Sequence, residues 1–136
     1  MKLTRASSYA LHAVACMAQQ KNVAKPVASH KIAEERGIPE RFLLKVLKPL
    51  VTARVLLSIK GPNGGYRLAR PASDINMLEI VEAVDGPLRG LVPAVEGAAG
   101  AKLDCQLTAI CDQAADTTRK QLQKVRLSDL AGPRAR

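Results

Sequence analysis

Hydrophobic positions recur at helical spacing in several segments of the chain, and cap or turn residues separate these segments. The first segment runs from about Thr4 to Gln20, and a second covers His30 to Arg36, with Ser29 expected as its N-cap. Gly37 is expected to close the second helix, because glycine readily adopts the left-handed conformation at a helix end. Pro39 is expected as the first residue of a third helix. The pattern therefore predicts one helix followed by a helix-turn-helix.

The third helix is expected to bury one side and to leave its charged residues outside. We expect Pro49 to distort its last turn, since a proline inside a helix removes a hydrogen bond and costs about 3 kcal/mol. The residues expected in the core are Phe42, Leu43, Val46, Leu47 and Leu50. The residues expected on the other sides are Glu40, Arg41, Leu44, Lys45 and Lys48. This helix is thus expected to be the second helix of the helix-turn-helix, with a charged side left exposed.

A β-hairpin is expected directly after the third helix. Two short runs with β-forming residues, Val55–Ile59 and Tyr66–Ala69, flank a tip that is rich in Gly, Pro and Asn and carries Lys60. Gly and Asn supply the positive φ angles that a tight turn requires. A helix-turn-helix followed at once by a basic hairpin predicts a winged helix, whose usual partner is double-stranded DNA.

Two further helices are expected in the second half of the chain. Asn76 and Glu79 have the spacing of a capping box, which predicts a helix that ends near Val84. From Cys105 to Arg126 the hydrophobic positions form one narrow stripe, which predicts a single long helix. Ser128 is expected to cap a last short turn. The stripe comprises Leu107, Ile110, Cys111, Ala114, Ala115, Thr118, Leu122 and Val125.

These elements predict a mostly α-helical protein with one small β-hairpin. We expect a winged helix-turn-helix domain over residues 1–86, a flexible loop over 87–104, a dimerisation helix over 105–131 and a disordered tail over 132–136. The long helix has little of its own domain to pack on, so its stripe is expected to meet the same helix of a second copy. The alternative is that the stripe packs back on its own chain. A two-fold dimer would present two recognition helices to a palindromic DNA site.

The distribution of charge supports a polyanionic partner. The formal net charge is +9. Residues 1–72 hold 13 Lys or Arg and 3 Asp or Glu, a net of +10, whereas residues 73–136 hold 8 and 9, a net of −1. The excess therefore lies in the half that holds the turn motif and the hairpin, which favours nucleic acid as the partner. With no membrane-length apolar run, no export signal near Met1 and three Cys, the sequence predicts a protein of the reducing cytoplasm.

No segment has the pattern of an enzyme active site. The sequence contains no phosphate-binding loop of the GxxxxGK[ST] type, no nucleophile elbow and no cluster of carboxylates with a histidine. We therefore expect a binding protein and not an enzyme. The alternative to a DNA-binding protein is a winged helix that serves as a protein-interaction module.

Several stretches of the chain match a known family. They are Met1–Thr4, Tyr9-Ala10, Ile32-Ala33, Gly37-Ile38, Ser58–Leu68, Glu79–Gly86 and Leu127–Leu130. On these residues the chain resembles the bacterial Rrf-type winged-helix regulators, the group that includes IscR, NsrR and CymR. The resemblance covers nearly the whole chain except residues 88–103. It implies a homodimeric transcriptional regulator, expected to act as a repressor.

The resemblance implies that the third helix enters the major groove and that the hairpin enters the adjacent minor groove. Glu40 is expected to accept a hydrogen bond from cytosine, and Arg41 to pair with guanine or a phosphate. Leu44 departs from relatives that carry a polar residue there, and it can contact only a thymine methyl group. The full expected DNA-binding set is Lys2, Thr4, Arg5, Ser29, Lys31, Pro39, Glu40, Arg41, Leu44, Lys45, Lys48, Lys60, Asn63, Gly64, Gly65, Tyr66 and Arg67.

Many relatives carry an iron–sulfur cluster on three closely spaced Cys residues. Here only Cys105 stands at such a position, and residues 88–104 contain no other Cys and no His. A cluster usually needs four good ligands, so no iron–sulfur cofactor and no metal is expected. One alternative is that His12, which shares a helix side with Cys16, meets Cys105 across the dimer as a cluster ligand.

The other alternative is thiol chemistry or a small-molecule effector. Cys105 is expected near a helix N-terminus, which would stabilise its thiolate and make it reactive towards oxidants. Cys111 is expected to be a buried, inert thiol, since free Cys is among the most buried residue types. The sequence leaves the signal open between an oxidant and a small ligand.

Overall fold

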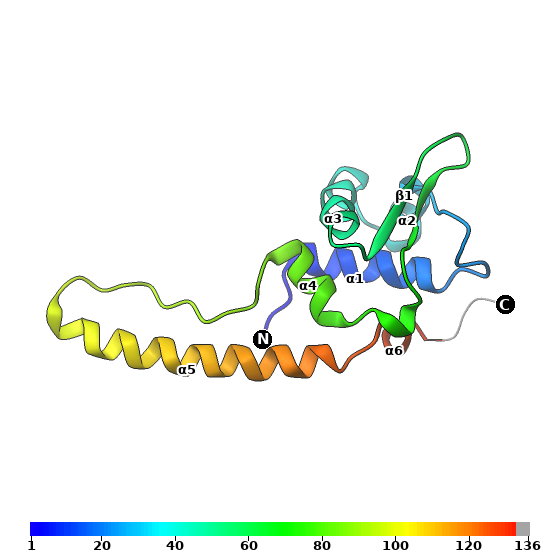
Figure 1. Cartoon of the computed structure of the whole chain (residues 1–136). Helices are drawn as coiled ribbons and strands as arrows, with labels where there is room; N and C mark the ends of the chain where they lie inside the picture. Colours follow the sequence, from blue (N-terminus) through cyan, green and yellow to red (C-terminus); the bar gives the residue numbers. More distant parts are fainter. Residues whose placement is uncertain (133–136) are drawn as a thin grey trace.

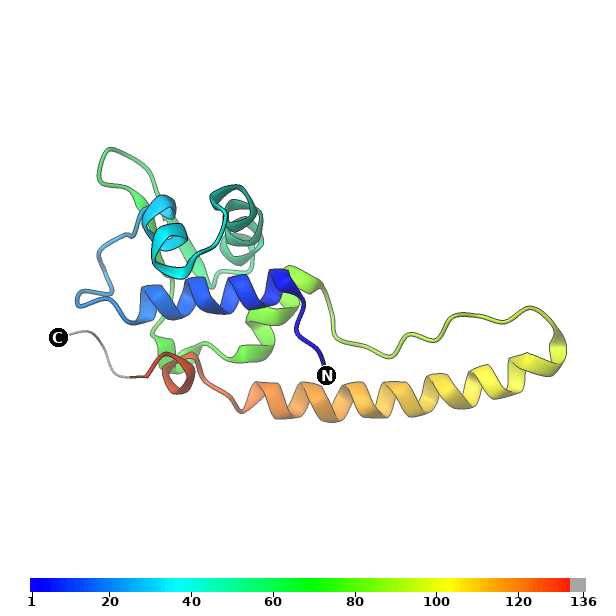
Figure 2. The same ribbon diagram turned by 180° about the vertical axis from the view of Figure 1, so that it is seen from behind.

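Six α-helices and one two-stranded antiparallel sheet make up residues 1–132, the part of the chain that this computed structural model describes (Figure 1). The elements are α1 (Arg5–Ala18), α2 (Ser29–Arg36), α3 (Glu40–Thr52), β1 (Leu56–Ile59), β2 (Gly65–Leu68), the 3-10 turn η1 (Ala72–Asp74), α4 (Met77–Asp85), α5 (Ala98–Gln123) and α6 (Leu127–Ala131). The other side of the molecule shows the same arrangement, with α5 projecting away from the remaining helices (Figure 2). The predicted fold class is confirmed.

Helix α1 lies at the centre of the domain and packs against α3, α4 and α6. Its buried side consists largely of small residues such as Ala10 and Ala13, which lets neighbouring helices approach closely. At its start, Thr4 accepts a hydrogen bond from the backbone N–H of Ser7, and both hydroxyl groups donate to the carboxylate of Asp85. The beginning of α1 is thereby tied to the end of α4.

In the helix-turn-helix formed by α2 and α3, the N-cap of each helix lies one residue away from its predicted position. Ala28 is the N-cap of α2 and Ser29 is its first residue, so the prediction that Ser29 caps this helix is wrong. The Ser29 hydroxyl donates instead to the Glu40 carboxylate at 3.1 Å. Pro39, predicted as the first residue of α3, is its N-cap, because its ψ of 127° is extended and not helical. Gly37 has a φ of 64° and closes α2 as predicted.

Helix α3 buries most of the predicted residues. Phe42 is the exception: it is 39% exposed and the prediction that it joins the core is wrong. Its position lies at the edge between the buried row and the basic row, and its ring lies beneath the side chains of Arg41 and Lys45. The helix continues past Pro49 to its end at Thr52. The buried residues of α3 are Leu43, Val46, Leu47 and Leu50.

The hairpin is confirmed, with Leu56 opposite Leu68 and Ile59 opposite Gly65. The outer edge of β2 is also paired, since Val27 and Tyr66 exchange two backbone hydrogen bonds of 2.9 Å. Gly65 makes this pairing possible. Its φ is +153°, and an added Cβ would stand 2.3 Å from the carbonyl oxygen of Val27. The hairpin is therefore held against the segment that leads into α2.

The capping box at the start of α4 is confirmed, because Asn76 and Glu79 each accept a hydrogen bond from the backbone of the other. The predicted boundaries of the last two helices are wrong. Helix α5 begins at Ala98, seven residues before Cys105, and α6 has Arg126 and not Ser128 at its N-cap. Of the predicted tail, residues 133–136 lie outside the described part of the chain.

The two ends of α5 have different surroundings. Near its C-terminal end, Ala115 and Leu122 are buried and Arg119 forms an ion pair with Glu82 of α4. Near its N-terminal end the large apolar side chains are exposed. These are Leu103 (56%), Leu107 (38%) and Ile110 (61%). The predicted stripe is therefore divided: part of it packs on its own chain, and part of it is not covered by any of residues 1–132.

The segment between α4 and α5 runs back along α5 in both views (Figures 1 and 2). The backbone N–H of Gly90 donates to Asp112 at 3.1 Å, and that of Val95 donates to Asp104 at 3.0 Å. These two contacts fasten residues 87–97 to α5. The predicted loop thus has no regular secondary structure over 87–97, but residues 98–104 belong to the helix.

Candidate nucleic-acid interface

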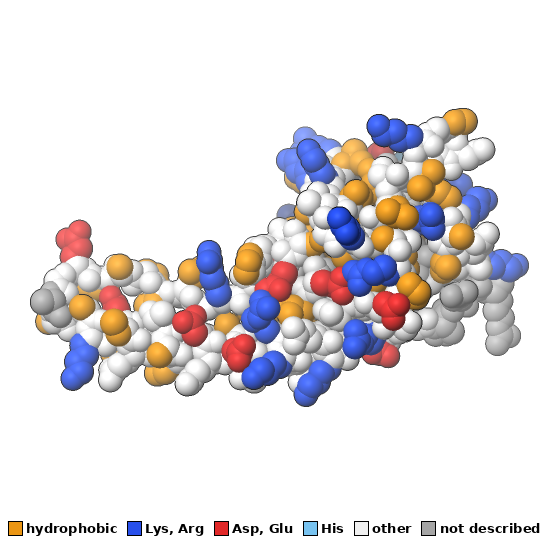
Figure 3. All heavy atoms as spheres, viewed as in Figure 1, with side chains coloured by type: hydrophobic (Ala, Val, Ile, Leu, Met, Phe, Trp, Pro, Cys, Tyr) orange, Lys and Arg blue, Asp and Glu red, His pale blue; other side chains and the backbone are white. Residues whose placement is uncertain are grey.

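Six exposed cations of the first half of the molecule lie on α3, on the hairpin tip and at the start of α1, and the others lie on α2 and in the loops. In Figure 3, Lys and Arg side chains lie over α3 and the hairpin with few acidic side chains near them, whereas basic and acidic side chains are mixed over α4 and α5. The ion pairs found within residues 1–132 join Arg70 to Glu79, Arg119 to Glu82 and Lys120 to Asp116. None of them uses a cation of α3 or of the hairpin tip, so these cations are available to an anionic partner.

The outer face of α3 is formed by residues whose side chains are all exposed, as predicted. Because they recur at helical spacing, they project to one side of the helix. Glu40 is held in place by the hydroxyl of Ser29, which comes from the start of α2. Leu44 is 43% exposed and offers only an apolar contact. The residues of this face are Glu40, Arg41, Leu44, Lys45 and Lys48.

The hairpin tip comprises residues 60–64, and Lys60 and Asn63 are exposed there. The tip is closed by a hydrogen bond of 3.0 Å from the N–H of Gly64 to the carbonyl of Gly61. Tyr66 and Arg67 lie further down β2 and are half-buried. The tip therefore presents one lysine on a narrow glycine-rich turn, while Arg67 belongs to the base of the hairpin.

Arg70 fixes the base of the hairpin and was not among the predicted site residues. Its guanidinium donates to the carbonyl of Arg54 at 3.3 Å and to that of Asp74 at 2.9 Å, and it forms an ion pair with Glu79. Arg54 itself has a φ of 61°, which turns the chain from α3 into β1. Two of these acceptors, on Arg54 and Glu79, lie 16 and 9 residues away in sequence, so no helix or turn periodicity could have marked Arg70. The side chain sets the position of β2 relative to α3 and α4.

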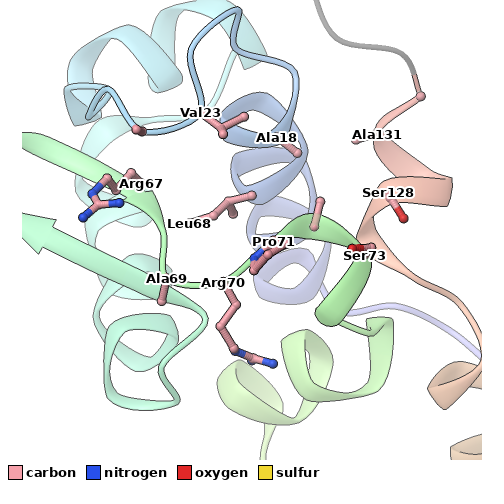
Figure 4. Close-up of a pocket in the computed structure, with 13 residues that line it drawn as sticks. Ala18, Val23, Arg67, Leu68, Ala69, Arg70, Pro71, Ser73, Ser128 and Ala131 are labelled. Carbon is pink, nitrogen blue, oxygen red and sulfur yellow. The ribbon is translucent and has the colours of Figure 1, made fainter.

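A hollow of about 540 Å³ lies beside the base of the hairpin, between the end of α1, η1 and α6 (Figure 4). Its wall is mainly aliphatic, with Ala18, Leu68 and Ala131 from three different elements. Arg70 also lines it, but the guanidinium reaches its own partners in α4 and η1. Ser73 and Ser128 add two hydroxyl groups. This hollow therefore carries no side-chain set that selects a ligand.

At the start of α1, the predicted phosphate contacts divide into two kinds. Lys2 and Arg5 are exposed. Thr4 already donates its hydroxyl proton to Asp85, at 2.8 and 2.9 Å from the two carboxylate oxygens. The Thr4 hydroxyl therefore serves the fold, and Lys2 and Arg5 remain as the cations of this segment. On α2, Lys31 is exposed as well.

Cys16 lies between α1 and α2 and is 1% exposed. Its thiol donates to the Glu35 carboxylate at 2.8 Å. Burial, followed by the hydrogen bond and negative charge of Glu35, raises the pKa of Cys16 to about 11, although Arg36 opposes part of this effect. His12, one helical turn earlier, is exposed. Cys16 is thus a protonated and protected thiol at neutral pH, which does not suit a redox sensor or a metal ligand.

Cys105 and Cys111 both lie on α5. Because α5 begins at Ala98, Cys105 is two turns inside the helix, and the N-terminal charge effect that was predicted for it is confined to the first turn. Cys105 is exposed, and Cys111 is partly exposed and not buried as expected. Within residues 1–132, no group of three or more His, Cys, Asp or Glu side chains converges in a way that could hold a metal ion. The described residues of one chain therefore do not fit an iron site.

None of the helices described is long and apolar enough to span a bilayer.

Comparison with known proteins places these features in a family. The Rrf2 family model, described as an iron-dependent transcriptional regulator, matches residues 3–133. The transcriptional regulator IscR of Cereibacter sphaeroides is 28% identical over 134 residues, which cover 96% of this chain and 86% of IscR. Two candidate helix-turn-helix regulators from Mycobacterium tuberculosis strains are 38% identical over 86 residues, or 62% of this chain. The chain spans about half of their length, 53%.

Among solved structures, CymR, the global cysteine regulator of B. subtilis, is similar with a TM-score of 0.74 and 26% sequence identity. The match covers 96% of each chain. The similarity therefore extends over the winged helix-turn-helix and the long helix together.

Proposed function

Since this chain belongs to the Rrf2 family, we propose that it is a transcriptional regulator that binds a palindromic operator in double-stranded DNA as a homodimer. The observation that carries this proposal is the exposed basic surface of α3, the hairpin tip and the start of α1, whose cations have no acidic partner within the described residues. A surface of this kind binds phosphates and is strongly dependent on salt.

In this proposal α3 enters the major groove, which is about 12 Å wide and admits one helix. Arg41 pairs with guanine or with a phosphate, and Glu40 accepts a hydrogen bond from a cytosine amino group. The Ser29 hydroxyl, at 3.1 Å from Glu40, restricts the carboxylate to one orientation. The hairpin enters the adjacent minor groove, where the negative potential attracts Lys60. Lys45 and Lys48 neutralise phosphates along the edge of the groove.

The second copy in this proposal covers the exposed part of α5. Leu103, Leu107 and Ile110 stand at intervals of four and three residues, so they form one apolar row on the helix. Two such rows pack against one another in an antiparallel or crossed pair, and the two-fold axis relates the two α3 helices. Two half-sites about one helical turn apart, roughly 34 Å, then complete the operator.

A dimer bound in this way occupies DNA that other proteins would need, and we therefore assign it the role of a cytoplasmic repressor. The signal that releases it is an oxidant or a small ligand. Cys105 is the exposed thiol closest to the apolar row of α5, so its modification would act on the dimer contact.

The proposal is tested by selecting DNA sequences bound by the wild-type protein from a random pool, followed by fluorescence anisotropy on the selected site. Charge reversals Arg41→Glu and Lys60→Glu should each weaken binding at least tenfold and lower the slope of log K against log salt. Lys120→Glu is the matched control, because Lys120 is an exposed cation of α5 and not of this surface. Sedimentation should give a dimer, and Ile110→Asp a monomer.

Selection of no sequence, or equal affinity for all three charge-reversal variants, would contradict DNA binding by this surface. In that case the winged helix would be a protein-interaction module. A monomeric wild-type protein that still binds the selected site would refute the dimer alone.

A further inference from the structure

A second hollow of about 220 Å³ lies between α1 and α3, on the side of α3 that faces α1. It is distinct from the hollow beside the hairpin base, since the two share no residue. We name it the Phe42 pocket. Its lining residues are Arg5, Ala6 and Tyr9 from α1, and Phe42, Lys45 and Val46 from α3.

The pocket combines an apolar floor with a cationic rim. Ala6 and Val46 are largely covered, and the aromatic rings of Tyr9 and Phe42 form the sides. Arg5 and Lys45 are exposed at the edge, and no acidic side chain lines the pocket. Neither cation belongs to an ion pair within residues 1–132. The charge of the site is therefore uncompensated and positive.

The ring of Phe42 contacts Lys45, one of the two cations of the rim, and also the neighbouring Arg41. The guanidinium carbon of Arg41 is 4.9 Å from the ring centroid, and the ammonium nitrogen of Lys45 is 5.6 Å from it. Cations at this distance are attracted to the negative face of an aromatic ring. Phe42 therefore keeps positive charge beside an apolar hollow. Its side chain is 39% exposed because the ring lies at the surface beneath these cations.

We propose that the Phe42 pocket binds a small aromatic carboxylate with a single ring. Ligand pockets for drug-sized molecules usually measure about 300–1,000 Å³, so a hollow of about 220 Å³ accommodates one ring with a short substituent. The ring of the ligand packs against Phe42 and Tyr9 in an offset or edge-to-face arrangement. Its carboxylate meets Arg5 and Lys45, and a guanidinium and an ammonium are both suited to this partner.

The other anion that could reach this place is the sugar–phosphate backbone of DNA. The two cations of the pocket, Arg5 and Lys45, also belong to the proposed DNA-binding surface, but the position of its apolar residues argues against DNA as the occupant. Phe42 and Val46 lie on the side of α3 that faces α1, whereas Leu44 and Lys48 lie on the outer face. A phosphate group also gains nothing from an apolar floor, while an aromatic ring gains by leaving water. The observations therefore favour a ligand with an apolar body and one negative charge.

If the proposed DNA-binding function holds, the pocket has a consequence for it. Arg5 and Lys45 would each serve both the carboxylate and a DNA phosphate, so the two ligands compete for them. Bound ligand then lowers the affinity for DNA, and bound DNA lowers the affinity for the ligand by the same factor. This part of the inference rests on the proposed function, but the pocket itself does not.

The test is isothermal titration of the full-length protein with benzoate, and with benzyl alcohol as an uncharged probe of nearly the same shape. For so few atoms we expect saturable binding of benzoate with a Kd on the order of 0.1–1 mM. Benzyl alcohol should bind at least fivefold more weakly. Phe42→Leu should weaken benzoate binding about three- to tenfold, because it removes the ring but keeps an apolar side chain. Arg5→Gln should weaken it about two- to fivefold.

The control variant is Lys120→Gln, which removes an exposed cation of α5 and should leave benzoate binding unchanged. Non-saturable binding of benzoate, equal affinity for benzoate and benzyl alcohol, or wild-type affinity for benzoate in both Phe42→Leu and Arg5→Gln would overturn the proposal. Weaker DNA binding in Phe42→Leu without any binding of benzoate would assign the pocket to the DNA backbone and also overturn it. Benzoate binding by a protein that selects no DNA would uphold the pocket and reject only the proposed regulator.

Discussion

Replacing Gly65 by alanine tests whether the hairpin is held by its close contact with the segment before α2. The new Cβ would stand 2.3 Å from the carbonyl oxygen of Val27 and 2.8 Å from the nitrogen of Ala28, both of them backbone atoms. Strand β2 would have to move, and the two hydrogen bonds between Val27 and Tyr66 would break. Each contributes about 1 kcal/mol. The φ of +153° costs an alanine about 1–3 kcal/mol more. Together Gly65→Ala should lower the free energy of unfolding by about 3–5 kcal/mol.

Gly61→Ala is the matched control for this substitution. Gly61 also has a positive φ, +112°, but an added Cβ would meet nothing within 4 Å. It should therefore cost only the conformational part, about 1–3 kcal/mol. Urea unfolding followed by circular dichroism, with equal m-values, gives both free energies. If the two variants lose the same stability within about 0.5 kcal/mol, the contact with Val27 does not restrain the hairpin and this reasoning is refuted.

Three further substitutions test the interior and the docking of α5. The pKa of Cys16 is raised from an ordinary 9.0 to about 11, so the folded protein holds this proton more tightly than the unfolded chain does. The stability that the protonated Cys16 thiol contributes is complete below pH 9 and is lost as the pH rises towards 11. Urea unfolding at pH 8 and at pH 10 should therefore show a loss of stability in the wild-type protein that Cys16→Ala lacks. Asp85→Ala removes the acceptor of the fully buried Ser7 hydroxyl and should cost about 1.5–3 kcal/mol in thermal unfolding. If the double variant with Ser7→Ala is no more stable than Asp85→Ala, the unsatisfied hydroxyl is not the cause. Arg119→Gln should cost only about 0.2–1 kcal/mol in urea unfolding, because its ion pair is partly exposed, and a loss above 2 kcal/mol would contradict a surface role.

Elements whose signals are local could be predicted from the sequence. Asn76 and Glu79 form the capping box within one turn, so their spacing alone defines the start of α4. Gly37 ends α2 for an equally local reason, since its φ of 64° is easily adopted by glycine. The glycine-rich tip between two β-forming runs marked the hairpin. The rows of buried residues on α3 follow from helical periodicity.

Predictions failed at positions where the sequence is compatible with more than one local arrangement. Ser29 is a good N-cap residue, but Ala28 is the N-cap and Ser29 is the first residue of α2, from which its hydroxyl donates to Glu40 of α3. Phe42 is hydrophobic and was expected inside, but cations of its own helix share its ring at the surface. Residues 98–104 are rich in Ala and Gly and show no hydrophobic period, so the first turns of α5 left no signal.

The sequence by itself determined that this chain is a winged helix-turn-helix with a long terminal helix, and that its positive charge belongs to the first half. These features depend on residues within one turn or one hairpin, where cap geometry, glycine conformations and side-chain periodicity decide the structure. Only the tertiary structure decided which groups meet from distant segments: Arg70 with Arg54, Cys16 with Glu35, and α1 with α3 around the Phe42 pocket. Such contacts depend on the packing of whole helices, which no local pattern encodes.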